Sequence, residues 1–226
     1  MYICLMQKKY CQLLIVIASL FVIKGTIAQY PLSVTDIDGN VYSTVRIGNQ
    51  IWMKENLRTT RYLNGDPIQH MSSNEKWKTT KEGARSAYNN DSLLGKQLGF
   101  LYNYHAVYNW RGICPWGWHI PSVYEWEQLI QYLDGASGAG AKLKAVEKWN
   151  LKHQPAIGAV PFAALPAGFR NAMGFFDNMG SNASFWSASI REDNVAWFFI
   201  INQNDPRLIK VSGSTNYGMS CRCIKD

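Results

Sequence analysis

Apolar and polar side chains alternate along residues 34–56, a segment that two turn signals interrupt. The turn signals are Asp38-Gly39-Asn40 and Gly48-Asn49, whose residue types favour the tight turns of β-hairpins. Alternation with a period of two directs one face of a strand toward a core and the other toward water. The pattern therefore predicts short antiparallel strands at about residues 33–37, 41–47 and 50–54.

A helical period occurs farther along, in residues 122–134. Ser122 and Glu125 have the spacing of a capping box, and they directly follow Pro121. Gly135 ends the pattern, as glycine often does at the C-terminus of a helix. These signals predict the main helix of the protein. The apolar residues that share one face of this helix are Val123, Trp126, Leu129, Ile130 and Leu133.

A second, shorter helix is expected at about residues 140–148, where Leu143 and Val146 would be buried. Residues 57–98 are polar and show no regular period, so we expect loops or packed coil there. After Asn150 the period changes to two, which indicates strands. Strands, then helices, then an antiparallel meander predict an α+β fold. The predicted C-terminal strands comprise residues 184–189, 195–202, 208–212 and 219–224.

The first 28 residues have the order of a secretory signal peptide. Lys8 and Lys9 precede an apolar run at residues 13–23, and Thr26-Ile27-Ala28 resembles a cleavage site. The apolar run is too short to span a bilayer, and no cysteine follows it where a bacterial lipid anchor would need one. We therefore expect cleavage after Ala28, export to the periplasm or cell surface, and a single domain at residues 29–226.

Removal of the predicted signal peptide changes the charge of the chain. Residues 1–28 contain three lysines and no acidic residue, so the formal net charge falls from +7 to +4. No cluster of Lys and Arg alternates with aromatic residues, so we expect no nucleic-acid partner. All nine tryptophans follow residue 28. No later stretch is apolar enough to predict a membrane span, and the remaining length suits one domain with a substantial core.

The run ICPWGWHIPSVYEWEQL, residues 113–129, combines residue types that often perform chemistry. Glu125 is better explained as a helix cap than as a general acid, since its spacing from the preceding serine matches a capping box. Trp118 and His119 would alternate across a short strand, so one would face the core and the other solvent or a hydrogen-bond partner. No second ligand lies at metal-binding spacing from His119. We interpret this run, and likewise His105, as structural.

Eight short motifs occur in a fixed order after residue 28: GNQIWMKENL (48–57), NND (89–91), GFLYNYHAV (99–107), CPWGWHIPS (114–122), EW (125–126), LPAGFRN (165–171), FWSAS (185–189) and RCIKD (222–226). Together they resemble the Fibrobacter succinogenes major paralogous domain, found in secreted and surface proteins of Bacteroidetes-type bacteria. The resemblance implies a C-type-lectin-like fold, similar in outline to the sulfatase-modifying factor domain, and an undefined biochemical role. Trp116 departs from the family pattern, and either a binding role or a core position would explain it.

The resemblance also bears on the three cysteines that follow the signal peptide. Cys223 belongs to the matching C-terminal motif, and the last strand of a lectin-like fold returns beside the early elements. We therefore expect a disulfide between Cys114 and Cys223, which export would permit, and a free thiol at Cys221. Cys221 would lie on the same face of a strand as Cys223, so it could compete for Cys114. A bridge between Cys221 and Cys223 is disfavoured because their Cβ directions are nearly parallel.

The resemblance, the export signal and the aromatic content favour a non-catalytic binding or structural module with an unknown ligand, a glycan or a protein. Lectin-like folds bind ligands on loops between their terminal strands, which here are residues 169–182 and 202–216. Calcium-dependent sugar binding is disfavoured, because neither a Glu-Pro-Asn nor a Trp-Asn-Asp triplet is present. We expect no cofactor and no catalytic residue. The candidate ligand residues are Arg170, Asn171, Asn182, Trp186, Asn202, Asn204, Asp205 and Asn216.

An alternative function is a copper-dependent oxidoreductase similar to the formylglycine-generating enzymes. Those enzymes bind copper through two C-terminal cysteines with four residues between them. Cys223 matches the second cysteine, but Gly218 occupies the position of the first, and Cys221 is too close. A hydrolase is also disfavoured, since the sequence has no G-x-S-x-G motif and no carboxylate pair at a diagnostic spacing.

Overall fold

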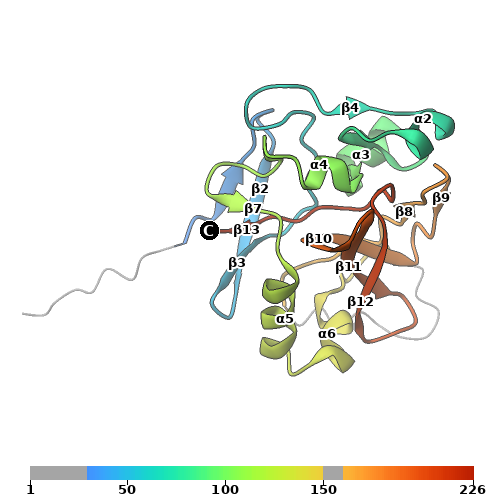
Figure 1. The fold of residues 1–226 in the computed structure, drawn as a ribbon. Coiled ribbons are helices and arrows are strands. Elements are labelled where there is room, and N and C mark those ends of the chain that lie inside the picture. The colour runs from blue at the N-terminus through green and yellow to red at the C-terminus, as the bar shows by residue number, and fades with distance from the viewer. Residues whose placement is uncertain (1–29, 150–159) are drawn as a thin grey trace, which may run out of the picture. The chain divides into compact units, whose positions relative to one another are not determined.

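The computed structural model describes residues 30–149 and 160–226 (Figure 1). The predicted signal peptide lies outside the described residues, as does the segment 150–159. Strands, short helices and further strands follow one another along the chain, which confirms the predicted α+β class. Among the described residues, no helix is both long enough and apolar enough to span a bilayer.

The largest sheet joins early strands of the chain to its last one. Residues alternate between exposed and buried along much of its second strand, and Gly48 makes the following turn with a φ of +60°. The predicted N-terminal strands are therefore confirmed. The order in the sheet, with every neighbour antiparallel, is β1 (Ser33–Thr35), β2 (Val41–Ile47), β3 (Gln50–Met53), β13 (Ile224–Lys225) and β7 (Trp118–His119).

A second sheet contains three of the four predicted C-terminal strands as consecutive antiparallel hairpins. These are β10 (Asn182–Glu192), β11 (Val195–Asn202) and β12 (Leu208–Ser214). The prediction of a fourth strand at 219–224 is wrong over most of its length, because only Ile224–Lys225 forms β13. Residues 218–220 instead make isolated bridges to three different segments of the chain, at Arg170, Tyr102 and Phe185.

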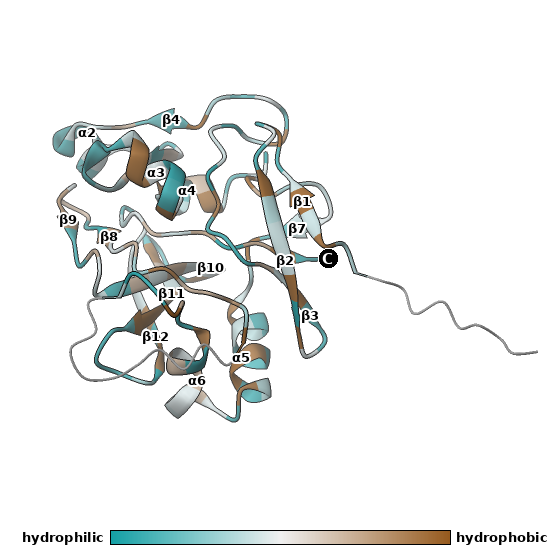
Figure 2. Cartoon of the chain, turned by 180° about the vertical axis from the view of Figure 1, so that it is seen from behind, coloured by the Kyte–Doolittle hydropathy of each residue, from teal (hydrophilic) through white to brown (hydrophobic). Residues whose placement is uncertain are grey.

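The predicted main helix is confirmed as α5 (Val123–Tyr132). The capping box is present: the Ser122 hydroxyl accepts from the backbone N–H of Glu125 at 3.3 Å, and the Glu125 carboxylate accepts from the backbone N–H of Ser122 at 2.8 Å. Figure 2 shows hydrophobic and hydrophilic stretches along α5, as expected for an amphipathic helix. Trp126 on the apolar face is fully buried, with ring centroids 4.9 Å from both Trp52 and Phe199, so α5 links the two sheets.

The second helix begins and ends earlier than predicted. It is α6 (Ala136–Leu143), after which the backbone N–H of Ala145 donates to the carbonyl of Ala164 at 2.9 Å. This pairing draws the chain out of the helix, so Val146 is exposed and its predicted burial is wrong. The predicted burial of Leu143 is confirmed.

The expectation of irregular coil at residues 57–98 is also wrong. Short elements form there because side chains cap them locally: Ser73 accepts from the N–H of Lys76, and Asp91 accepts from the N–H of Leu93. The helices of this part are α2 (Asn74–Thr79), the 3₁₀ helix η1 (Tyr88–Asn90) and α3 (Ser92–Leu98), and α4 (Tyr104–Val107) follows it. The strands of two further small sheets are β4 (Gln69–His70), β5 (Ala84–Ser86) and β6 (Leu101–Tyr102), and β8 (Phe169–Arg170) and β9 (Phe176–Asp177).

The structure confirms the predicted disulfide between Cys114 and Cys223, whose Cα atoms lie 6.0 Å apart. Strand β13 lies between β3 and β7, so the C-terminal residues pass directly beside the segment that leads into β7. Cys221 is buried and is the one free cysteine of the described part of the chain. Although Cys221 lies only two residues before Cys223, it is not bonded to Cys114.

Candidate functional site

Arg170 was predicted to contact ligand, but it is fully buried. Its Nε donates to the carbonyl of Gly174 at 2.8 Å, and its guanidinium lies 4.3 Å from the centre of the Trp77 ring. Burial lowers the pKa of Arg170 to about 10. This side chain joins α2 to β8 from inside the protein, so it forms no part of an accessible ligand surface.

Trp186 and Asn216, two further predicted ligand residues, are also buried. The indole of Trp186 donates to the carbonyl of Tyr102 at 2.7 Å. The side-chain amide of Asn216 donates to the carbonyl of Lys78 at 2.7 Å. Both side chains satisfy buried backbone groups, and a polar composition alone does not reveal which side of a hairpin faces inward.

The remaining predicted residues belong mostly to one end of the second sheet. The side-chain amide of Asn202 donates to that of Asn182 across β10 and β11 at 2.8 Å. Asn204 and Asp205 lie in the next turn, and Arg207 pairs with Asp205 at 2.6 Å. Asn216 follows β12 and therefore lies at the opposite end of that sheet, so the two predicted loops do not form one surface. Between β8 and β9, the side-chain amide of Asn171 donates to Asp177 at 2.9 Å.

A hollow of 440 Å³ lies elsewhere, beside α4. We call it the aromatic groove, because three tyrosine or tryptophan rings contribute to its wall. Two of these rings are largely exposed: Trp110 is 87% exposed and Tyr108 is 70% exposed. The complete lining is Lys81, Glu82, Gly83, Tyr104, His105, Tyr108, Asn109, Trp110, Ile190, Asn194 and Thr215.

Asn103, the N-cap of α4, joins the two sides of the aromatic groove. Its side-chain oxygen accepts from the backbone N–H groups of Ala106 and Ala84, at 3.0 and 2.8 Å. Its amide nitrogen donates to the carbonyl of Glu82 at 2.8 Å. A Cβ on Gly83 would lie 2.9 Å from the Cα of Ala106, so only glycine permits this close approach. The backbone of the groove is thus fixed by hydrogen bonds and packing.

Tyr104 supports the aromatic wall from below. Its ring stacks on that of Tyr108, with centroids 5.9 Å apart and planes 11° from parallel. Its hydroxyl donates to the carbonyl of Ala188 at 2.7 Å, and burial raises its pKa well above the usual value. Tyr104 is therefore fixed and neutral, and it orients the exposed ring of Tyr108.

The turn that presents Trp110 is also well ordered. Arg111 donates from Nε to the side chain of Asn109 at 2.9 Å and pairs with Asp66 at 2.9 Å. Its guanidinium lies 3.9 Å from the centre of the Tyr62 ring. The N–H of Gly112 donates to the carbonyl of Asn109 at 2.9 Å. These contacts fix both neighbours of Trp110, although the indole itself is exposed.

The aromatic groove has the chemistry of a binding site for an uncharged or weakly charged polar ligand. Exposed ring faces can stack on apolar ligand surfaces. The rim supplies amide, hydroxyl and imidazole groups at Asn109, Asn194, Thr215 and His105, together with one cation and one carboxylate. Glycoside hydrolysis normally needs two carboxyl groups across the scissile bond, and the groove lining contains one, Glu82.

His119, in the run at 113–129, is held between two carboxylates. Its Nε2 lies 2.7 Å from Glu125 and its Nδ1 lies 2.6 Å from Asp226. Partial burial alone would lower the pKa of His119, but the hydrogen bonds that its ring donates to these carboxylates outweigh it and raise the pKa. Partial burial alone would raise the pKa of Glu125, but bonds from Ser122 and His119 outweigh it and lower the pKa.

These contacts agree with the structural interpretation of the run, and they leave the Glu125 carboxylate fully engaged as a cap. An apolar hollow of 460 Å³ adjoins the pair. Trp116 is 82% exposed, so the alternative that placed it in the core is wrong. It does not line this hollow or the aromatic groove.

Metal binding requires several ligand side chains close together. Within 30–149 and 160–226, no three His, Cys, Asp or Glu side chains lie close enough together to hold a metal ion. The disulfide occupies the thiol of Cys223, which the copper hypothesis needs as a ligand. Burial raises the pKa of Cys221 well above its usual value, so this thiol is protonated at neutral pH.

Sequence reasoning did not identify Tyr104, Tyr108 and Trp110 as site residues. One local signal was present, since Asn103 precedes two tyrosines spaced four residues apart, which on a short capped helix lie on one face. The groove beside Trp110 had no local signal, because residues far away in the sequence, Ile190, Asn194 and Thr215, complete its lining.

Comparison with known proteins gives one match. The Fibrobacter succinogenes major domain matches residues 45–225. No curated protein and no solved structure matches the chain. Because the matched segment covers most of the sequence, the predicted family is confirmed, and the chain belongs to the Fibrobacter succinogenes major domain family.

Proposed function

We propose that this protein is an exported, non-catalytic module that binds carbohydrate in the aromatic groove. The observation that supports this most is the pair of adjacent, exposed rings of Tyr108 and Trp110 above a fixed, polar-rimmed hollow. Exposed tryptophan is costly in water and is concentrated at binding surfaces. The rings offer apolar faces to the C–H faces of sugars, and the rim offers hydrogen bonds to hydroxyls.

The groove is pre-organised, which reduces the entropy lost on binding. Tyr104, Asn103 and Arg111 are fixed by buried or multiple hydrogen bonds, so the surrounding backbone does not need to be ordered by the ligand. A protein partner would use the same exposed rings, and we propose the glycan because the rings border a hollow with a polar rim and not a flat apolar patch.

The test begins with a glycan array that is probed with residues 29–226. The affinity for the best oligosaccharide is then measured by calorimetry for the native sequence, Trp110→Ala and Trp116→Ala. Trp110→Ala should weaken binding by about 10-fold or more, since central aromatic contacts dominate such sites. Trp116→Ala is the matched control, because Trp116 is equally exposed and nearby in sequence but lies outside the groove. Equal losses in both variants, or binding only to a protein partner, would contradict the proposal.

Export is the second part of the proposal. The order of charged, apolar and small residues in 1–28 supports secretion and cleavage after Ala28, and the disulfide between Cys114 and Cys223 is chemically stable in an oxidising compartment. Intact-mass measurement of protein recovered from outside the cytoplasm should show a chain that begins at Gln29. Recovery of that protein with residues 1–28 attached would contradict cleavage.

We also propose that the fold is C-type-lectin-like, as the family resemblance implies. The return of β13 to a place between β3 and β7 supports this, because it brings both ends of the domain into one sheet. An experimental structure that superposes on a lectin-like domain over β2, β3, α5 and β10–β13 is the expected outcome, and a different strand order would contradict it.

A further inference from the structure

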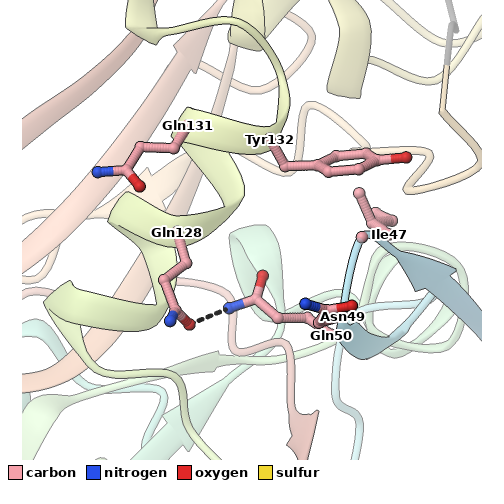
Figure 3. A pocket seen from close by; sticks show the side chains of 7 residues that line it. Ile47, Asn49, Gln50, Gln128, Gln131 and Tyr132 are labelled. Carbon is pink, nitrogen blue, oxygen red and sulfur yellow. Dashed lines mark hydrogen bonds between the residues drawn. The ribbon is translucent and has the colours of Figure 1, made fainter.

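A third hollow, of 330 Å³, lies between the β2–β3 turn and α5 (Figure 3). We call it the amide-lined hollow, because amide side chains are its most frequent component. Asn49 and Gln50 approach it from the turn, and Gln128 and Gln131 from the helix. The complete lining is Ile47, Gly48, Asn49, Gln50, Gln128, Gln131 and Tyr132, and none of these side chains is charged.

Gln50 gives this hollow a fixed base. Its Nε2 donates to the backbone carbonyl of Glu125 at 2.8 Å and to the Oε1 of Gln128 at 3.3 Å. Its Oε1 accepts from the indole N–H of Trp52 at 3.1 Å. The amide of Gln50 is therefore fully used, and it joins the turn to the helix. Because the bond from Gln50 orients the Gln128 amide, the nitrogen of that amide is left available.

Tyr132 forms one wall of the amide-lined hollow. A Cβ on Gly48 would lie 2.8 Å from the Cδ2 of the Tyr132 ring, so the bare backbone of the turn makes room for this ring. Gly48 also has a φ of +60°, a conformation that favours glycine. The ring remains 59% exposed. Figure 3 shows it extending across the turn above Ile47 and Asn49.

Asn49, Gln128 and Gln131 are exposed, and among the described residues the amides of Asn49 and Gln131 make no hydrogen bond within the protein. The amides of Asn49 and Gln131 each offer a donor and an acceptor in one plane, which matches the adjacent hydroxyls of a sugar, and Gln128 adds the donor of its free nitrogen. A ring wall with amide groups around it suits a ligand with apolar faces and many hydroxyls. The uncharged lining provides no counterion for a charged ligand.

We propose that the amide-lined hollow is a second saccharide site, selective for neutral oligosaccharides. It shares no residue with the aromatic groove, since its lining comes from β2, β3 and α5 and not from α4 or the β10–β11 turn. If the aromatic groove also binds glycan, as proposed above, one protein molecule holds two glycan segments and can bridge two chains. The bridging consequence rests on the proposed function, whereas the second site does not.

The test observes the amide groups directly. The protein carries the Trp110→Ala substitution, and its ¹⁵N–¹H spectrum resolves the side-chain NH₂ groups. Neutral hexasaccharides of glucose, mannose and xylose are added at millimolar concentration. A hexamer of galacturonate serves as the charged probe. A neutral hexasaccharide should shift the NH₂ resonances of Asn49, Gln128 and Gln131. Gln131→Ala should weaken this binding about 5-fold, as expected for the loss of one hydrogen bond. Gln97→Ala, at an exposed glutamine of α3, should leave it unchanged.

Three results would overturn the second site: no shift with any neutral hexasaccharide, a shift only with galacturonate, or equal weakening by Gln131→Ala and Gln97→Ala. The failure of one site is distinguishable from the failure of the other. Shifts at these amides together with full affinity in the Trp110→Ala variant would support the hollow and contradict the aromatic groove. A loss of all binding in Trp110→Ala, without amide shifts in that variant, would support the groove alone.

Discussion

The run at residues 113–129 and the segment at residues 104–110 differ in two respects. They differ in how strongly their residue types suggest a functional site, and in whether their structures expose groups to a ligand. The run contains cysteine, histidine, glutamate and three tryptophans, yet its histidine and the capping glutamate are already bonded: His119 to Glu125 and Asp226, and Glu125 to Ser122. The segment at 104–110 has the sequence of an ordinary helix and turn. It presents two exposed rings, Tyr108 and Trp110, above a polar-rimmed groove.

The difference shows that reactive residue types do not by themselves mark a functional site. A ligand needs groups whose bonding capacity is unused and whose position is already fixed. For Cys114, His119 and Glu125 in the run at 113–129, that capacity is used by the disulfide, by the contacts between His119 and its carboxylates, and by capping. In the segment at 104–110 the supporting side chain of Tyr104 is buried, whereas the rings of Tyr108 and Trp110 are exposed. Substitutions of Cys114, His119 or Glu125 should therefore affect stability, and substitutions of Tyr108 or Trp110 should affect binding.

The largest effect is expected from removing the disulfide. Replacing both Cys114 and Cys223 with Ala opens a loop with a sequence separation of 109 residues, which on the chain-entropy model lowers the free energy of unfolding by about 4–5 kcal/mol. Urea denaturation followed by tryptophan fluorescence measures this loss. Affinity for the glycan, measured at low temperature where the variant is folded, should be unchanged.

Cys221→Ala is the matched control for this pair, because Cys221 is buried but free. It removes one sulfur atom from the core and should cost about 1 kcal/mol. A larger loss for Cys221→Ala than for the double variant would show that the disulfide contributes little.

Substitutions at two glutamates compare the run at 113–129 with the aromatic groove directly, and their effects on stability should be smaller than that of the disulfide. Glu125→Ala removes the capping box and the partner of His119, so it should cost about 1–2 kcal/mol of unfolding free energy and leave glycan affinity unchanged. Glu82→Ala removes an exposed carboxylate that makes no hydrogen bond among the described residues. It should change stability by less than about 0.5 kcal/mol and weaken glycan binding about 5-fold. Thermal denaturation measures the stability of both variants, and calorimetry measures their glycan affinity. A loss of affinity in Glu125→Ala and a loss of stability in Glu82→Ala would contradict the assignment of the two regions.

The scaffold was largely predictable because its signals are local. The alternation of β2, the turn at Gly48 and the capping box of α5 each depend on residues within a few positions of one another. The end of α6 was not predictable in this way, since it is set by the pairing of Ala145 with Ala164. Burial of Arg170 likewise depends on Trp77, far away in the sequence.

The candidate site was less predictable than the scaffold, for the same physical reason. Whether Tyr108 and Trp110 are exposed is decided by which distant segments pack against α4. The same holds for Asn216, whose amide is buried because it satisfies the carbonyl of Lys78 on another part of the chain. Composition predicts that a loop can bind, but long-range packing determines which of its side chains are free.

The pH dependence of stability should report the pair of His119 and Glu125 in the run at 113–129. The raised pKa of His119 means that its contribution is complete below the unfolded value of 6.5 and is lost as pH rises through the folded pKa. The lowered pKa of Glu125 means that its contribution is complete above 4.5 and is lost as pH falls through the folded pKa. Stability from this pair is therefore greatest between pH 4.5 and 6.5. Both groups are partly exposed, so solvent screening keeps the effect below about 1 kcal/mol.

Thermal denaturation of the native protein and of His119→Gln across pH 3–9 isolates the contribution of His119 to stability. The native protein should lose stability relative to His119→Gln as pH rises from 6.5 through the folded pKa of His119. A constant difference between the two proteins from pH 5 to pH 9 would show that His119 does not titrate with its carboxylate partners.

The smallest effect is expected from Tyr108→Phe, which removes one exposed hydroxyl and keeps the ring. The stack on Tyr104 at 5.9 Å persists, so the free energy of unfolding should change by less than about 0.5 kcal/mol. If the ring face binds the sugar, affinity should fall by no more than about 2-fold in Tyr108→Phe, whereas Tyr108→Ala should cost about 10-fold because it removes the face itself. Calorimetry on the two variants separates these contributions. Equal losses in both would mean that the hydroxyl, and not the ring, recognises the ligand.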